Sequence, residues 1–167
     1  PAGDGVEFFR MLNHLGDSSR ELVFLGDIFD LWIALPGYET PLQERFLAWC
    51  RRQRRRRSVG FMEGNHEFFV CRAHQAAFTW CSADEHLRDG GGRVFAHGDR
   101  INRRDLNYRR FRGLIKNPLT RRLLPAIPGG PALAEWAKQS LRRTNVNFRK
   151  HLPLAEIEAF VASQACA

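Results

Sequence analysis

The sequence predicts an α/β fold, a layered β-sheet core flanked by helices, and two observations support this. Three short apolar runs each end in a polar cluster that contains glycine, at ELVFLGD (21–27), SVGFMEGNH (58–66) and RVFAHGD (93–99). Segments with helical spacing separate the runs, which gives the order strand, helix, strand, helix, strand. With 167 residues, the chain is long enough for one domain with a core of ordinary size.

A first helix is predicted near the start of the chain. Val6, Phe9 and Leu12 follow helical spacing and form one apolar face. Asp4 is the candidate cap of this helix, and Gly16 is its predicted end.

A second helix is predicted to begin at Thr40, which supplies a capping hydroxyl. Gln43 stands three residues further on, where its amide can complete a capping box. Leu42, Phe46 and Trp49 then form an apolar face that we expect to lie in the core.

The arginine run RRQRRRR (51–57) follows this second helix and allows two interpretations. It is either an arm that binds nucleic acid or a solvated helix end, where cations complement the negative end of the helix dipole. The second interpretation is favoured, because no aromatic residues interleave the arginines to form a stacking surface.

The chain becomes basic and helical after Asp99, with no obvious strand. We therefore predict three segments: a core over 1–99, a basic helical cap or lid over 100–151, and a helix over 152–167 that returns to the core. The cap segment interleaves apolar residues with arginines, which fits a cover over a site or a membrane-surface element. An ordinary surface pair of helices that closes its own small core fits equally well.

Composition narrows the class of protein. The formal net charge of +8 favours partners that carry phosphate, such as nucleic acid, anionic lipid or a phosphorylated small molecule. No apolar stretch approaches the roughly 18 to 20 residues of a membrane-spanning helix. The sequence has four cysteines, Cys50, Cys71, Cys81 and Cys166, and they have neither a CxxC pair nor metal-ligand spacing. We therefore predict that their thiols are reduced and that the protein is cytoplasmic.

Polar side chains follow each of the three predicted strands. Asp27 follows the first, Asn65 and His66 follow the second, and His97 lies at the end of the third. Ligands bind at the carboxyl ends of the strands in open α/β sheets, so we expect these clusters to converge. Each residue alone is compatible with a turn, a cap or a structural histidine, but these roles do not explain why all three strands end alike. Carboxylate, amide and imidazole together suit Mn²⁺, Fe²⁺ or Zn²⁺.

These clusters carry a family resemblance. GDIFD (26–30), GNHE (64–67) and HGD (97–99), in this order and spacing, resemble the middle blocks of the calcineurin-like metallophosphoesterases. The outer blocks of that superfamily are a D-x-H before GDIFD and a G-H-x-H after HGD, and neither occurs in its place in this sequence, so we expect an incomplete domain. The segment after HGD, together with GDIFDLWI, resembles the UDP-2,3-diacylglucosamine pyrophosphatases of lipid A biosynthesis, over residues 21 to 150.

The resemblance implies roles for individual residues around two divalent metal ions, Mn²⁺ first, with Fe²⁺ and Zn²⁺ as alternatives. Asp27 bridges the two ions, and Asn65 and His97 bind the second. His66 lies beside the phosphate and donates a hydrogen bond or a proton. Three acidic residues are implied to support the ligands: Asp30, Glu67 and Asp99. Substrate contacts are predicted in the basic segment at Asn102, Arg103, Asp105, Tyr108, Arg112, Arg142, Arg143, Arg149 and Lys150.

The functional prediction is hydrolysis of the pyrophosphate bond of UDP-2,3-diacylglucosamine to UMP and a lipid monophosphate, without useful turnover by these residues alone. A phosphatase for another phosphomonoester or nucleotide is the alternative, because the lipid A group often carries arginine where this chain has His66. An alternative of another class is a non-catalytic basic module that binds nucleic acid or anionic lipid. We expect a cytoplasmic protein that contacts the anionic inner-membrane surface peripherally, and no specific nucleic-acid partner.

Overall fold

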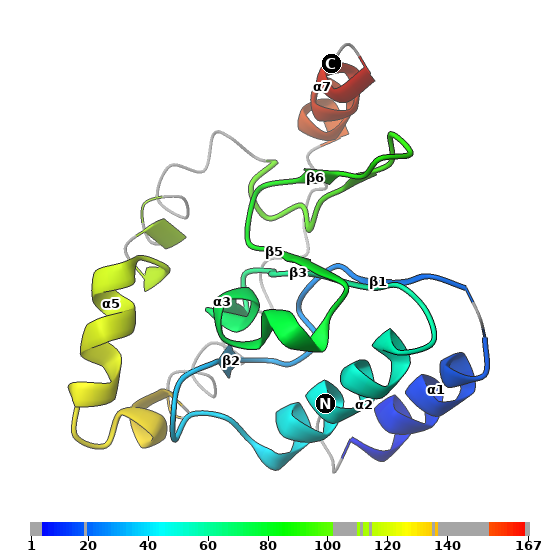
Figure 1. The fold of residues 1–167 in the computed structure, drawn as a ribbon. Helices are drawn as coiled ribbons and strands as arrows, with labels where there is room; N and C mark the ends of the chain where they lie inside the picture. The colour runs from blue at the N-terminus through cyan, green and yellow to red at the C-terminus, as the bar shows by residue number, and fades with distance from the viewer. Residues whose placement is uncertain are drawn as a thin grey trace. The chain divides into compact units, whose positions relative to one another are not determined.

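The structure is a computed structural model that describes residues 5–18, 20–101, 110, 112–113, 115–134, 136 and 154–165. The chain forms two compact units, Pro1–Asp84 and Glu85–Ala167 (Figure 1). The predicted mixed α/β class, with parallel strands flanked by helices, is confirmed. The domain boundary expected after residue 99 stays a prediction.

A three-stranded parallel sheet forms the centre of the first unit. Its strands are β1 (Leu22–Phe24), β3 (Val59–Met62) and β5 (Trp80–Ser82), in the order β1-β3-β5. All four residues of β3 are buried, as expected for the central strand of a covered sheet. The first two predicted strands are therefore neighbours, and their carboxyl ends lie at the same edge.

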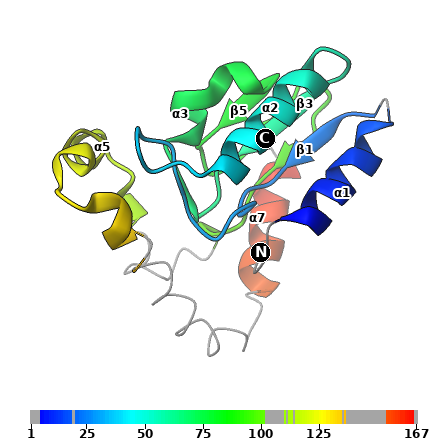
Figure 2. The same ribbon diagram turned by 90° about the horizontal axis from the view of Figure 1, so that it is seen from below.

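Two helices flank this sheet, α1 (Val6–Gly16) and α2 (Pro41–Arg54), and Figure 2 shows both running alongside β1 and β3. Aromatic rings join these elements: the Phe46 ring lies 5.1 Å from Phe24 and 5.9 Å from Phe8, measured between centroids. Phe46 itself is fully buried. Burial of these rings supplies much of the apolar driving force for the unit.

The predicted ends of the helices are largely confirmed. α1 ends at Gly16, but its N-cap is Gly5 in a left-handed conformation (φ 72°), and Asp4 lies outside the described residues. Thr40 and Gln43 form the predicted capping box at the start of α2, with the Gln43 Oε1 atom 2.8 Å from the Thr40 backbone N.

The arginine run 51–57 begins in the last turn of α2 and is mostly a solvated helix end, as the sequence indicates. Arg51, Arg52 and residues 54–56 are exposed. Arg57 differs, because its side chain is buried and its Nη1 atom donates a hydrogen bond to the Ser18 carbonyl oxygen at 2.7 Å. Burial lowers the pKa of Arg57. The periodicity of the run does not distinguish this packed arginine from its exposed neighbours.

Two further parallel strands and a short helix complete the first unit. They are β2 (Trp32–Ile33) and β4 (Glu67–Phe68), which pair with each other, and α3 (Val70–His74), which continues into the 3₁₀ turn η1 (Gln75–Ala77). The sequence analysis does not predict β2 and β4, because two-residue strands are too short to show a period. It does expect a helix between the second and third apolar runs, where α3 lies.

The third predicted strand is placed wrongly. The segment 93–99 does contain a strand, β7 (Val94–Phe95), but this strand pairs antiparallel with β6 (Leu87–Arg88) in the second unit. The reason is a local turn: the Asp89 carboxylate accepts hydrogen bonds from the backbone N–H groups of Gly91 and Arg93 and closes a hairpin. The third strand of the parallel sheet is β5 instead.

The second unit also contains helices among its described residues. α5 (Pro118–Leu123) is capped by Asn117, whose side chain accepts a hydrogen bond from the Thr120 N–H. The helix continues into η2 (Leu124–Ala126). α7 (Leu154–Ala165) falls within the helix predicted over 152–167. It contacts the hairpin of its own unit, where Arg88 donates to the Gln164 carbonyl oxygen. A return of α7 to the core stays a prediction. Among the described helices, none has the length and apolar character needed to cross a membrane.

The cysteines require a correction. Cys71 at the start of α3 and Cys81 in β5 form a disulfide, so the prediction that these thiols are reduced is wrong. The pairing depends on β5, which the sequence analysis does not predict. Cys50 is a free, buried thiol, and burial raises its pKa. Cys166 lies outside the described residues. Cysteine spacing therefore no longer supports a reducing compartment.

Gly60→Ala tests the contact between β3 and β5. A Cβ atom at this position would lie 2.1 Å from Cζ2 of Trp80, so the indole covers the sheet only because Gly60 has no side chain. We expect a loss of about 1 to 3 kcal/mol in the free energy of unfolding, measured in urea, as for overpacked cores. Gly90→Ala is the matched control, because no heavy atom lies within 4 Å of the added Cβ there. Equal stabilities of the two variants would contradict the contact.

Reduction of the Cys71–Cys81 disulfide tests its contribution to stability. The bond closes a loop with a sequence separation of 10. Loop-closure entropy for such a loop corresponds to about 2 to 3 kcal/mol. We therefore expect dithiothreitol to lower the urea midpoint of the wild type, and to leave that of the Cys71→Ser/Cys81→Ser double variant unchanged. Alkylation of both thiols in unreduced, folded protein would refute the disulfide.

Candidate functional site

Two of the three predicted polar clusters meet at the carboxyl edge of the parallel sheet. Asp27 follows β1, and Asn65 and His66 follow β3, which is the strand paired with β1. The backbone N–H of His66 donates to Oδ1 of Asp27 at 3.1 Å. The expected approach of these two clusters is therefore confirmed within the first unit.

Asp27 has an uncommon backbone conformation. Its φ is 55°, in the left-handed region, and Gly26 before it has φ 87°. Such a conformation costs a non-glycine residue of order 1 kcal/mol and tends to occur at functional sites, although aspartate tolerates it better than most residues. The two positive φ values turn the chain sharply after β1, and this turn presents the exposed Asp27 side chain at the sheet edge.

Glu67 holds this turn in place. Its side chain is fully buried in β4, and its Oε2 atom accepts hydrogen bonds from the N–H groups of Asp27 at 2.8 Å and Gly64 at 2.9 Å. Its Oε1 atom accepts from the Ile28 N–H at 2.9 Å. Burial raises the pKa of Glu67, while the three N–H donors act in the opposite direction. One carboxylate thus joins the loop after β1 to the loop after β3.

The paired strands β2 and β4 fix the loop from its other side. The backbone N–H of Trp32 donates to the His66 carbonyl oxygen at 2.8 Å, and the backbone N–H of Ala34 donates to the Phe68 carbonyl oxygen at 2.9 Å. His66 is therefore held through its N–H by Asp27 and through its carbonyl by Trp32. Its half-buried imidazole extends from a backbone fixed at both ends.

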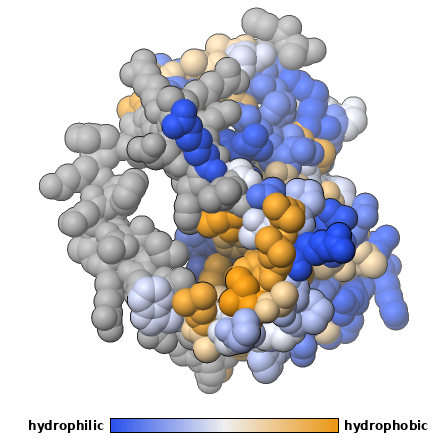
Figure 3. Space-filling view, turned by 90° about the vertical axis from the view of Figure 1, so that its left-hand side faces the viewer, coloured by the Kyte–Doolittle hydropathy of each residue, from blue (hydrophilic) through white to orange (hydrophobic). Residues whose placement is uncertain are grey.

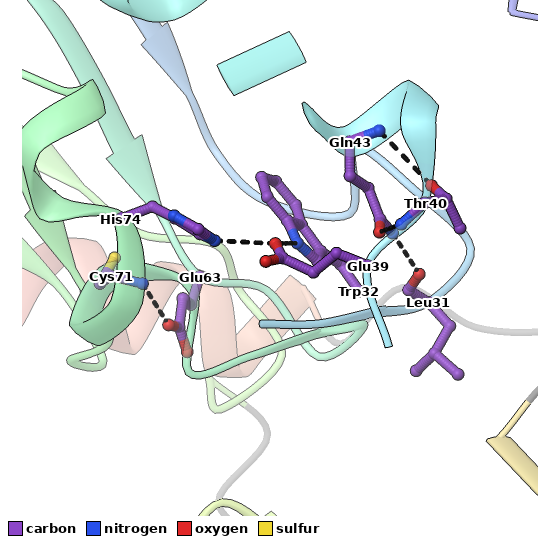
Figure 4. Close-up of polar contacts among 8 residues, drawn as sticks. All are labelled: Leu31, Trp32, Glu39, Thr40, Gln43, Glu63, Cys71 and His74. Carbon is purple, nitrogen blue, oxygen red and sulfur yellow. Dashed lines mark hydrogen bonds and ion pairs between the residues drawn. The ribbon is translucent and has the colours of Figure 1, made fainter. Parts of the chain in front are cut away.

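A partly buried polar network supports β2. As Figure 4 shows, Oε1 of Glu39 accepts from the Trp32 indole at 2.8 Å and contacts Nε2 of His74 on α3 at 2.7 Å. The rings of Trp32 and His74 are stacked. Glu39 and His74 are 35 residues apart, and no spacing in the sequence indicates their contact.

Glu63 anchors the start of the loop after β3. It is buried, and its Oε1 atom accepts from the Cys71 N–H at 2.7 Å, as Figure 4 also shows. Its own N–H donates to the Ser82 carbonyl oxygen in β5 at 2.8 Å. Glu63 thus connects the loop that carries Asn65 to α3, at the residue that forms the disulfide.

The remaining predicted residues are distributed as follows. Asp30 lies half-buried in the turn that Asp27 begins. His97 and Asp99 belong to the second unit, so convergence of His97 with Asp27 and Asn65 stays a prediction. The predicted substrate contacts that lie outside the described residues are Asn102, Arg103, Asp105, Tyr108, Arg142, Arg143, Arg149 and Lys150.

Asp99 and Arg112 form an ion pair in the second unit. Nε of Arg112 donates to Oδ2 of Asp99 at 2.8 Å. Both side chains are largely buried, with 12% of Arg112 and 10% of Asp99 exposed. The sequence analysis assigns Asp99 to metal support and Arg112 to substrate, and it does not predict the pair.

The donor chemistry of the first unit fits part of a metal site. Asp27 supplies a carboxylate and Asn65 an amide at neighbouring strand ends, whereas Glu67 uses both oxygens on backbone N–H groups. Within the described ranges, no three His, Cys, Asp or Glu side chains are grouped as a metal site. Asp27 and Asn65 fit the metal-binding roles implied for them, and these roles stay predictions.

Sequence comparison finds curated relatives of the chain. Proteins named UDP-2,3-diacylglucosamine hydrolase are 32% identical over 128 residues in Pseudomonas putida strain F1 and 31% identical over 159 residues in Nitrosococcus oceani. These matches cover 72% and 89% of this chain, and 52% and 59% of the relatives. The chain therefore spans about half the length of the curated relatives it matches. No protein-family model matches.

Glu67→Gln tests whether one carboxylate holds the two loops. The replacement amide places an NH₂ group against backbone donors, which leaves at least one buried N–H without an acceptor. We expect a loss of about 1 to 3 kcal/mol in the free energy of unfolding, measured in urea. Glu158→Gln on the exposed surface of α7 is the control and should have little effect. Unchanged stability of Glu67→Gln would show that the loops are held by other contacts.

Proposed function

Because the chain belongs to the UDP-2,3-diacylglucosamine hydrolase group of the metallophosphoesterase superfamily, we propose that the whole protein is a metal-dependent hydrolase. It cleaves the pyrophosphate bond of UDP-2,3-diacylglucosamine and releases UMP and a lipid monophosphate. The observation that carries the proposal is the fixed edge of the parallel sheet, where Glu67 binds the backbone N–H groups of Asp27 and of Gly64, the residue before Asn65, on neighbouring loops.

Asp27 and Asn65 are the residues of the first unit that would hold the metal ions, with Mn²⁺ first and Fe²⁺ and Zn²⁺ as alternatives. A pair of divalent ions at such a site lowers the pKa of bound water and offsets the charge of the phosphoryl group. The role of Asp27 and Asn65 is to present oxygen ligands from a backbone that does not need to rearrange. His97 is the further ligand proposed from the second unit.

His66 is proposed to act on the substrate phosphate. Its backbone is fixed by Asp27 and Trp32, and its imidazole can donate a hydrogen bond or a proton to a phosphate or leaving-group oxygen. Asp30 and Asp99 are proposed supports. The histidine also favours a second candidate, a phosphatase for a phosphomonoester or nucleotide, because the lipid A group often carries arginine at this position.

A lipid-linked substrate also implies contact with a membrane surface. Exposed apolar side chains gather on the face shown in Figure 3, over the segment that carries α5. The exposed large apolar residues in and after α5 are Leu119, Leu123, Ile127, Leu133 and Trp136. Together with the net charge of +8, they support a peripheral contact with the anionic inner-membrane surface on its cytoplasmic side.

Asp27→Asn in the whole protein tests the proposed reaction. Asparagine keeps the tolerance for the left-handed conformation but removes the charge, so a loss of activity reports on metal binding rather than on strain. We expect Mn²⁺-dependent release of UMP from UDP-2,3-diacylglucosamine to fall by at least about a hundredfold. Asp17→Asn, an exposed position after α1, is the matched control. A near-normal rate in Asp27→Asn would overturn the assignment, and a preference for aryl phosphates would select the second candidate.

A further inference from the structure

A basic cavity lies in the second unit. Its first lining residue, Arg100, directly follows the His97-Gly98-Asp99 segment in the sequence. Its volume is about 210 Å³, and Arg100, Arg112, Gly113 and Lys116 line it. The charged side chains among these described lining residues are all cations. The cavity is smaller than the roughly 300 to 1,000 Å³ of pockets for drug-sized ligands, so its size suits one small anionic group.

Arg112 is arranged to donate a hydrogen bond to an anion. Its Nε atom is bound to Asp99, which fixes the plane of the guanidinium, and its Nη2 atom is buried without a hydrogen-bond partner among the described residues. A buried donor of this kind is costly to leave unmet. A guanidinium with one fixed edge and one unmet donor is suited to bind a phosphate oxygen.

The remaining lining residues strengthen this chemistry. The Nη2 atom of Arg100 lies 3.9 Å from Oε2 of Glu85, which is too long for a hydrogen bond. The described residues that line the cavity thus bring three cations together, and Arg112 is the one paired with Asp99. A Cβ atom added at Gly113 would meet nothing within 4 Å, so a ligand can approach the backbone there.

We propose that this cavity is a binding site for a phosphate or diphosphate group. Two sources share this chemistry: the diphosphate of the nucleotide-linked lipid, or a free phosphate compound. The first source rests on the proposed function. The anion site itself does not, because its donors are side chains of the chain and require no metal.

Binding of inorganic pyrophosphate to the whole protein tests the site. The measurement is isothermal titration calorimetry in EDTA at fixed ionic strength, with folding of each variant checked by circular dichroism. We expect Arg100→Gln and Lys116→Gln each to weaken binding by about tenfold, because each removes a charged donor. Arg112→Lys keeps the charge but loses the planar fork, and we expect a similar loss.

Arg122→Gln is the matched control. This arginine is exposed on α5 and does not line the cavity, and its removal lowers the net charge by the same amount. Its effect on pyrophosphate binding should stay below about twofold, as for solvent-screened charges. Equal weakening by Arg122→Gln and Arg100→Gln would overturn the site, because the anion would then respond only to overall charge. Absence of pyrophosphate binding to the folded wild type would overturn it as well.

Kinetics of the whole protein with Mn²⁺ distinguish the two sources of the anion. If the substrate diphosphate occupies the cavity, Arg100→Gln raises KM and pyrophosphate inhibits competitively. If a free phosphate compound occupies it, pyrophosphate binds without competing and KM is unchanged. Either result retains the site. Pyrophosphate binding that persists in an inactive Asp27→Asn variant separates the cavity from the metal ligands, so failure of one proposal is distinguishable from failure of the other.

Discussion

The carboxylate of Glu67 is the contact on which the geometry of the first unit depends. A fully buried carboxylate is unfavourable unless hydrogen bonds replace its water, and here three backbone N–H groups do so. Those donors belong to the loops after β1 and β3, so satisfying the charge requires both loops to be in place. The positive φ of Asp27 follows from the same constraint, because the turn must aim its own N–H and that of Ile28 at one side chain.

The surrounding elements gain their importance from this contact. Glu67 lies in β4, whose register with β2 places it opposite Trp32. The Trp32 indole is held by Glu39, and Glu39 also contacts His74 on α3. A two-residue strand pair is too short to be stable alone, but here side-chain hydrogen bonds and aromatic packing fix it on both sides. The backbone of the loop with Asn65 and His66 is therefore preorganised, as the roles proposed for these residues require.

Sequence patterns with a local cause were predicted well, and those with a distant cause were not. The capping box at Thr40 and the adjacent polar clusters after β1 and β3 depend on neighbouring residues or on regular strand pairing, so spacing reveals them. The Cys71–Cys81 disulfide depends on β5, which has only three residues and lies on the sheet because Gly60 leaves room for an indole. The strand at 94–95 was predicted, but the turn at Asp89 gives it a nearby partner in place of the central sheet.

Charge has different consequences according to burial, and this decides which arginines matter. Most of the run at 51–57 is exposed, where water and salt screen each cation and little binding specificity results. The buried Arg57 and Arg112 each make a hydrogen bond to a fixed acceptor and retain guanidinium nitrogens without one. Arg57 packs over Trp49 and does not line the basic cavity, so its role is in the core. Arg112 instead lines a cavity with two more cations, so the same unmet donor there has room to bind an anion. Net charge favours phosphate in general, but a fixed donor beside an open volume is what can recognise it.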